Sequence, residues 1–119
     1  MSSPMSSQIS APVKKYLRAN AVGLWDRLST VTREMGDQIH HRLPLEWSHI
    51  FPDRFPNRLA NLNKVASDVH AKITTAWREF KTRLAGRDPT QTEVLDQARV
   101  VDQEFGAEMT KLKDTTKQS

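Results

Sequence analysis

The four histidines of this chain, His40, His41, His49 and His70, all lie between positions 40 and 70. Histidine is a common metal ligand and the side chain most readily tuned to accept a proton near neutral pH. The adjacent histidines His40 and His41 can supply a metal ligand and a general base. Asn61 can supply a group that orients the base, and His70 a second metal ligand. Hydrolysis of a phosphodiester needs a base that takes a proton from water and something that neutralises the charge on the phosphoryl oxygens. The pattern therefore predicts a protein that cuts nucleic acid.

The composition limits the chemistry that such a site could use. The chain has 119 residues and no cysteine, so we expect one domain without disulfides or a thiolate zinc site. Any metal must be bound by nitrogen and oxygen ligands. No apolar run is long enough to span a membrane, so we expect a soluble protein with no membrane segment. Residues 1–12 are rich in Ser and Pro and lack the regions of a classical signal peptide, which indicates a flexible leader. We place the domain at residues 13–112 and a polar tail at residues 113–119.

Positive charge is concentrated around the histidines. Residues 40–87 carry nine basic and four acidic side chains, a net charge of +5, whereas residues 88–119 carry four and seven, a net charge of −3. A positive surface raises the local concentration of a polyanion such as nucleic acid. A solvated helix face rich in Lys and Arg would give the same count.

Hydrophobic periodicity predicts three helices. The first follows Ser10 and Pro12, is ended by Gly36, and has the apolar stripe Val13, Leu17, Ala21, Leu24, Leu28, Val31 and Met35. The second is expected over residues 68–85, with Ser67 as its N-cap, Gly86 as its stop, and the apolar face Val69, Ile73, Trp77, Phe80 and Leu84. The third follows a capping box at Thr90–Glu93 and has the stripe Val94, Ala98, Val101 and Phe105.

Between the first two helices the pattern predicts a short hairpin. Residues 38–43 form one candidate strand and residues 59–65 another, separated by a rigid, proline-rich loop. The predicted fold is therefore α+β, a mainly helical small domain with a short hairpin plus helix in the middle, at about residues 38–85.

A hairpin packed on a helix brings the candidate site residues to one edge. Successive strand residues point to opposite faces, so one histidine of the pair can bind metal while the other faces the scissile phosphate. Asn61 could orient the base or hold the hairpin, and Asn57 and Asn63 compete with it for that role. His49 can belong to the site or be an ordinary surface histidine.

The order of these residues along the chain resembles that of a known superfamily. His40-His41-Arg42-Leu43-Pro44, then Asn57 to Leu62, then Val69-His70, are similar to the HNH/endonuclease VII superfamily of nucleases. The resemblance covers about residues 40–80, is greatest to the C-terminal nuclease domains of bacterial polymorphic toxins, and extends to the helix between Pro89 and Gly106. It implies a ββα-metal finger and a metal-dependent endonuclease.

The resemblance also implies a role for each residue of the pattern. His40 would be a metal ligand, His41 the general base, Asn61 the orienting asparagine and His70 a second metal ligand. Where colicin-type nucleases have another histidine, one helical turn after His70, this chain has Thr74. Two protein ligands suit one divalent ion, with Mg²⁺ or Mn²⁺ favoured over Zn²⁺, because catalytic zinc usually takes three.

The expected substrate is DNA, with RNA as the alternative. Arg42, Arg58, Lys64 and Lys72 are candidate phosphate contacts, for each of which solvated surface is the other interpretation. Resemblance to toxin domains implies a bacterial effector that is secreted or delivered into a target cell and neutralised by a cognate immunity protein. Two alternatives stay open, an inactive metal-stabilised module that binds nucleic acid or protein, and a helical interaction protein whose histidines are incidental.

Overall fold

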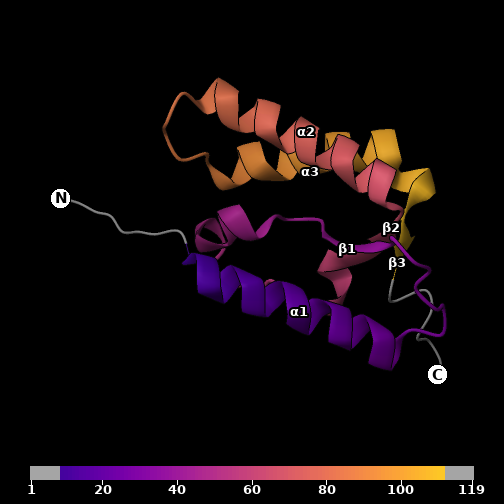
Figure 1. Ribbon diagram of the computed structural model, residues 1–119. Coiled ribbons are helices and arrows are strands. Elements are labelled where there is room, and N and C mark those ends of the chain that lie inside the picture. The colour runs from indigo at the N-terminus through magenta and orange to yellow at the C-terminus, as the bar shows by residue number, and fades with distance from the viewer. Residues whose placement is uncertain (1–8, 112–119) are drawn as a thin grey trace.

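The computed structural model describes residues 9–111 and contains three helices and a small sheet (Figure 1). In chain order the main elements are α1 (Ala11–Leu28), β1 (Gln38–His41), β2 (Leu62–Val65), α2 (Ser67–Leu84), α3 (Gln91–Phe105) and β3 (Thr110–Lys111). Short 3₁₀ helices occupy Leu45–Ile50 (η1), Leu59–Asn61 (η2) and Gly106–Glu108 (η3). The prediction of a mainly helical α+β domain, with a hairpin that leads into a helix, is confirmed. None of the helices within residues 9–111 is long and apolar enough to cross a membrane.

Two of the segments expected at the termini fall mostly beyond these bounds. Of the leader expected at residues 1–12, residues 1–8 lie outside the described residues, while Ala11 and Pro12 already belong to α1. The tail expected at residues 113–119 also lies outside the described residues.

The sheet is antiparallel, with the strand order β1-β2-β3. In the pairing of β1 with β2, His40 lies opposite Asn63 and His41 lies opposite Leu62. Helix α1 lies on one side of the sheet, and α2 and α3 lie on the other (Figure 1). The buried side chains follow this arrangement. Leu62 packs with Ala21 and Trp25 of α1, whereas Val65 belongs to the larger core made with α2 and α3.

The two later helices bury the stripes that the sequence predicted. On α2 these are Val69, Ile73, Trp77, Phe80 and Leu84, and on α3 they are Val94, Ala98, Val101 and Phe105. The capping box of α3 is present, with the Thr90 side chain accepting from the Glu93 backbone N–H. The N-cap of α2 was predicted wrongly, because the helix begins at Ser67 and Ala66 precedes it without a side-chain cap.

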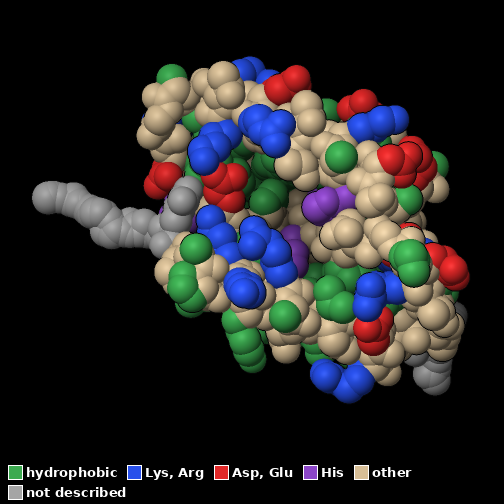
Figure 2. All heavy atoms as spheres, viewed as in Figure 1, with side chains coloured by type: hydrophobic (Ala, Val, Ile, Leu, Met, Phe, Trp, Pro, Cys, Tyr) green, Lys and Arg blue, Asp and Glu red, His purple; other side chains and the backbone are tan. Residues whose placement is uncertain are grey.

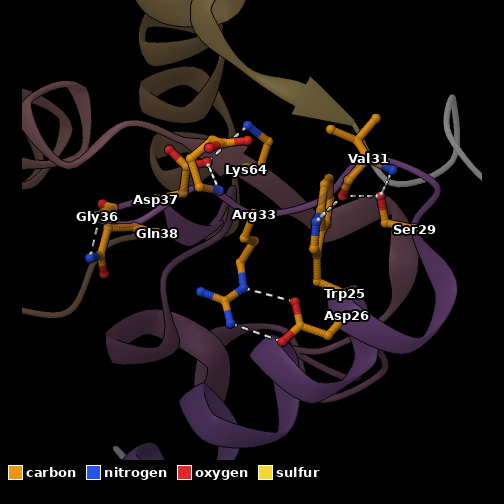
Figure 3. Close-up of polar contacts among 10 residues, drawn as sticks. Trp25, Asp26, Ser29, Val31, Arg33, Gly36, Asp37, Gln38 and Lys64 are labelled. Carbon is orange, nitrogen blue, oxygen red and sulfur yellow. Dashed lines mark hydrogen bonds and ion pairs between the residues drawn. The ribbon is translucent and has the colours of Figure 1, made fainter.

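Helix α1 ends earlier than its periodicity predicted. It stops at Leu28, and the stripe beyond it does not continue, since Val31 and Met35 are exposed. The carbonyl of Val31 accepts hydrogen bonds from Trp25 Nε1 at 3.2 Å and from Ser29 Oγ at 3.1 Å (Figure 3). Short polar side chains such as Ser29 offer the backbone such alternatives to helical bonding, which explains why the helix ends here.

The segment between α1 and β1 is held by two ion pairs (Figure 3). Arg33 contacts Asp26 at 2.8 Å, and Lys64 of β2 contacts Asp37 at 3.1 Å. The second pair joins the residue before β1 to the neighbouring strand. It therefore helps to fix the strand that carries His40 and His41.

Candidate active site

Three of the four histidines meet in one cleft. Its volume is about 330 Å³, and its lining includes His40 and His41 at the end of β1 and His70 in the first turn of α2. Figure 2 shows histidine atoms inside a hollow with Lys and Arg side chains along its sides. The structure thus brings together three residues that are up to thirty positions apart in sequence.

The imidazole of His41 is held by Asn57. His41 Nε2 and Asn57 Oδ1 are 2.6 Å apart. The amide nitrogen of Asn57 donates to the backbone carbonyl of Leu17 at 2.9 Å and to Asn20 Oδ1 at 2.8 Å. Because these two acceptors fix the amide nitrogen, Asn57 Oδ1 must face His41 and accept a hydrogen bond from its Nε2–H. His41 Nδ1 therefore keeps its lone pair.

The surroundings of His41 favour the neutral imidazole. Burial lowers the pKa of His41, while the hydrogen bond to Asn57 opposes that shift and the charge of Arg18 adds to it. Burial and Arg18 lower the pKa of His70 in the same way. A neutral imidazole is the form that can accept a proton from water or bind a metal ion.

His40 and His70 form the pair that could hold a metal ion. Their ring centroids lie 6.2 Å apart at an interplanar angle of 73°. His40 is 3% exposed, and its Nε2 has no hydrogen-bond partner among the described residues. Burial lowers the pKa of His40 to about 3, with a smaller effect from the charge of His70, so the imidazole is neutral near neutral pH, which is the form that binds a metal ion.

The donor set fits a divalent ion only in part. Within residues 9–111 no three His, Cys, Asp or Glu side chains are grouped as a metal site would require. Thr74, one turn after His70, lines the cleft but is exposed. Two imidazoles can supply two nitrogen ligands, and Mg²⁺ or Mn²⁺ would need oxygens of water and phosphate for the rest.

Asn61 does not take the place expected for it. Its Oδ1 accepts from the backbone N–H of Leu43 at 2.7 Å, and its Nδ2 donates to the carbonyls of Leu43 and Pro56 at 3.2 and 2.8 Å. The strand register explains the difference. His41 pairs with Leu62, so the residue before Leu62 reaches past the end of β1, not toward His41. Asn61 holds the loop, and the orienting contact belongs to Asn57, one of the two competing candidates.

The other competing asparagine, Asn63, lies opposite His40. Asn63 is 2% exposed and opposite His40 on the neighbouring strand, and its Nδ2 lacks a hydrogen-bond partner among the described residues. His49 is not among the residues that line the cleft. Its Nε2 lies 3.5 Å from a carboxylate oxygen of Asp88, and its ring lies 6.1 Å from that of Trp47.

None of the four expected phosphate contacts lines the cleft. Arg42 donates to Asp102 at 2.6 Å, and Lys64 is held in its ion pair with Asp37. Lys72 is exposed on α2, outside the lining of the cleft. Arg58 is partly buried, and its pKa is lowered by burial and by the neighbouring charges of Arg54 and Arg42.

Three other cations line the cleft instead, Arg18 from α1 and Arg78 and Lys81 from α2. Lys81 also contacts Glu46 at 2.6 Å. Arg78 and Lys81 follow His70 by eight and eleven residues, steps that keep them on one face of a helix, so helical spacing could have identified them. Nothing local in the sequence identifies Arg18, because its place depends on how α1 packs.

Comparison of the chain with protein-family models, with curated proteins and with solved structures gives no match. The function is therefore inferred from the residues and geometry of the cleft.

Proposed function

We propose that this protein is a metal-dependent endonuclease of the HNH type that hydrolyses phosphodiester bonds, with His41 as its general base. The observation that carries the proposal is the hydrogen bond from His41 Nε2–H to Asn57 Oδ1 at 2.6 Å. It fixes the tautomer of the imidazole and leaves Nδ1 unprotonated, and His41 lines a cleft that also contains Arg18, Arg78 and Lys81. A positioned general base typically contributes about 10²- to 10⁴-fold to a rate.

His41 takes the proton from water as the water oxygen attacks phosphorus, and the bond between phosphorus and the leaving oxygen breaks. The imidazolium that forms keeps its hydrogen bond to Asn57, which stabilises the positive charge. Arg18 lies close enough to depress the pKa of His41 and of His70, and its guanidinium can pair with a phosphate oxygen. A bound phosphate would neutralise Arg18 and so raise the basicity of His41 when the substrate is in place.

His40 and His70 would hold the divalent ion. When bound, such an ion would neutralise charge on the phosphate and its leaving oxygen. The unpartnered Nε2 of buried His40, among the described residues, and the adjacent ring of His70 support this role. Because these two imidazoles are the only ligands proposed from the chain, we expect the ion to bind more tightly when a phosphate is present.

The experiment is incubation of plasmid DNA, linear single-stranded DNA and RNA with the purified protein. Each is tested with Mg²⁺, Mn²⁺, Zn²⁺ or EDTA. The proposal predicts cleavage of at least one substrate that needs metal and is abolished by EDTA. Intact substrates in every lane, together with a metal-dependent rise in melting temperature, would support the alternative, a metal-stabilised module that binds without cutting. If metal changed neither cleavage nor melting temperature, the result would favour the third interpretation, a helical interaction protein whose histidines are incidental.

The sequence resemblance to toxin domains supports a further part of the proposal, that the biological role is that of an antibacterial effector with an acidic immunity protein as its partner. The +5 charge of residues 40–87 suits such a partner. Expression in the bacterial cytoplasm should then stop growth, and the product of a neighbouring gene should relieve the arrest. Normal growth during expression of a protein that cuts DNA in vitro would contradict the effector role.

A further inference from the structure

The cleft extends along α2 well beyond the histidines. His70, Ile73, Thr74, Trp77, Arg78 and Lys81 all line it, at steps of three and four residues that place them on one side of the helix. From His70 to Lys81 the helix rises by roughly 16 Å at about 1.5 Å per residue. The lining therefore forms a groove that starts at the proposed catalytic residues and ends at the pair of Lys81 with Glu46.

Besides the histidines, Pro44, Thr74 and the carboxylate of Glu46, the groove is lined by cations and by apolar side chains. Arg18, Arg78 and Lys81 are cations that can pair with successive phosphates of one strand. Leu45, Ile73 and Trp77 are apolar side chains, buried at 4%, 2% and 7% exposure, and they also contribute to its walls. An apolar surface beside a cationic one matches an unstacked base beside its own phosphate.

The volume of the groove and the burial of His40 disfavour a duplex as its ligand. His40 is 3% exposed, and helices α1 and α2 lie on opposite sides of the strands that carry the site (Figure 1). A volume of about 330 Å³ is near the lower limit for sites that hold small molecules. A phosphate must therefore descend between two helical walls, and in a duplex the stacked bases and the second strand would stay outside them.

We infer that this groove binds a single-stranded polynucleotide, with Arg78 and Lys81 as anchors for phosphates next to the scissile one. The inference rests on the proposed function for its scissile phosphate, but its binding prediction can be tested separately. Both side chains are exposed, and among the described residues Lys81 makes one ion pair, to the partly buried carboxylate of Glu46. Removing an ion pair that is largely open to solvent costs little stability, so the variants should fold.

The test measures fluorescence anisotropy of labelled oligonucleotides of about twelve nucleotides, a length within the range of single-strand sites. The protein carries His41→Ala, so that the probe is not cut. Single-stranded DNA, single-stranded RNA and a DNA duplex of one sequence are compared in Mg²⁺. We expect one of the single strands to bind at least tenfold more tightly than the duplex, and the comparison of DNA with RNA identifies the substrate.

The matched variants are Arg78→Ala/Lys81→Ala and, as control, Lys72→Ala/Arg83→Ala. Each pair removes two positive charges from α2, but Lys72 and Arg83 are exposed and lie roughly on the opposite side of the helix. Loss of two phosphate contacts should weaken single-strand binding about tenfold. It should also reduce the magnitude of the slope of log K against log salt concentration by about 1.4. The control variant should keep the affinity and the slope of the parent protein. Equal binding of the duplex, or an equal loss in the control, would overturn the inference.

Cleavage of the same oligonucleotides by the unmutated protein separates this inference from the proposed function. Single-strand binding through Arg78 and Lys81 without any cleavage would support the groove assignment and contradict the proposed nuclease activity. Metal-dependent cleavage of a duplex that binds as tightly as its single strands would contradict the single-strand groove and support the nuclease activity.

Discussion

His41 and Asn57 are joined by a hydrogen bond of 2.6 Å, and Asn57 is itself fixed to the backbone of α1 by a bond of 2.9 Å to the carbonyl of Leu17. A helix at the start of the chain thus sets the tautomer of a histidine at the end of the first strand. The proposed base depends on a residue that orients it, on a loop that carries that residue and on a helix that anchors the loop.

The role of Asn57 can be separated from simple support of the fold by a pH profile. In Asn57→Asp a carboxylate faces His41, so the pKa of His41 should rise and the acidic limb of kcat/KM should move to higher pH. The substitution also removes the donor to Leu17, which should lower stability by about 1–3 kcal/mol. A lower melting temperature with an unchanged acidic limb would show that Asn57 is structural only.

Asn61 should behave in the opposite way. Its side chain makes three hydrogen bonds to the backbone of Leu43 and Pro56 and is 1% exposed. Asn61→Ala leaves a buried N–H without an acceptor, so we expect a loss of about 1–3 kcal/mol in the free energy of unfolding. Denaturant unfolding measures this loss. At a temperature where the variant is folded, its acidic limb should match that of the unmutated protein, and a displaced limb would assign Asn61 a part in orienting His41.

Acid should destabilise the protein through His40. Its pKa is about 3 in the folded state, against 6.5 as its ordinary value, so between these values the unfolded chain binds the proton more readily. The contribution of neutral His40 to the free energy of unfolding is therefore fully present above about pH 6.5. It is lost progressively as the pH falls toward about 3. Melting temperature measured from about pH 7.5 to about pH 4 should show this fall, and His40→Gln should reduce its slope. An equal slope in both proteins would contradict the buried neutral state of His40.

Lys64 and Arg18 should differ in what their removal affects. Lys64 is partly buried in an ion pair with Asp37, whereas Arg18 lines the cleft. Lys64→Ala should lower the melting temperature and leave affinity for oligonucleotides unchanged. Arg18→Ala should weaken that affinity and raise the pKa of His41, because it removes a charge that opposes protonation. Fluorescence anisotropy and melting curves on both variants check this. A loss of oligonucleotide affinity in Lys64→Ala, with no loss in Arg18→Ala, would show that Lys64 contacts the substrate.

The sequence predicted the elements better than the contacts between them. The stripes on α2 and α3 and the Thr90–Glu93 capping box follow from local spacing, and they are present. The overlong first helix was wrong because its apolar spacing continues into residues 29–32, where short side chains bond the backbone instead.

In the site, the sequence was sufficient for the histidines and insufficient for their partners. His40, His41 and His70 come together because a hairpin followed by a helix brings them together. The choice between Asn57 and Asn61 depends on strand register, and the position of Arg18 depends on the packing of α1. Both are tertiary facts that no local pattern of residue types contains.

The most direct test of His41 as the base is a single-turnover cleavage rate for three proteins, unmutated, His41→Ala and His49→Ala, with and without metal. His49 lies outside the cleft lining, so its variant controls for the loss of an imidazole elsewhere in the fold. We predict a metal-dependent rate that falls about 10²- to 10⁴-fold in His41→Ala and stays within severalfold in His49→Ala, with both variants folded by circular dichroism. A folded His41→Ala protein that cuts at the unmutated rate would contradict the assignment of the base.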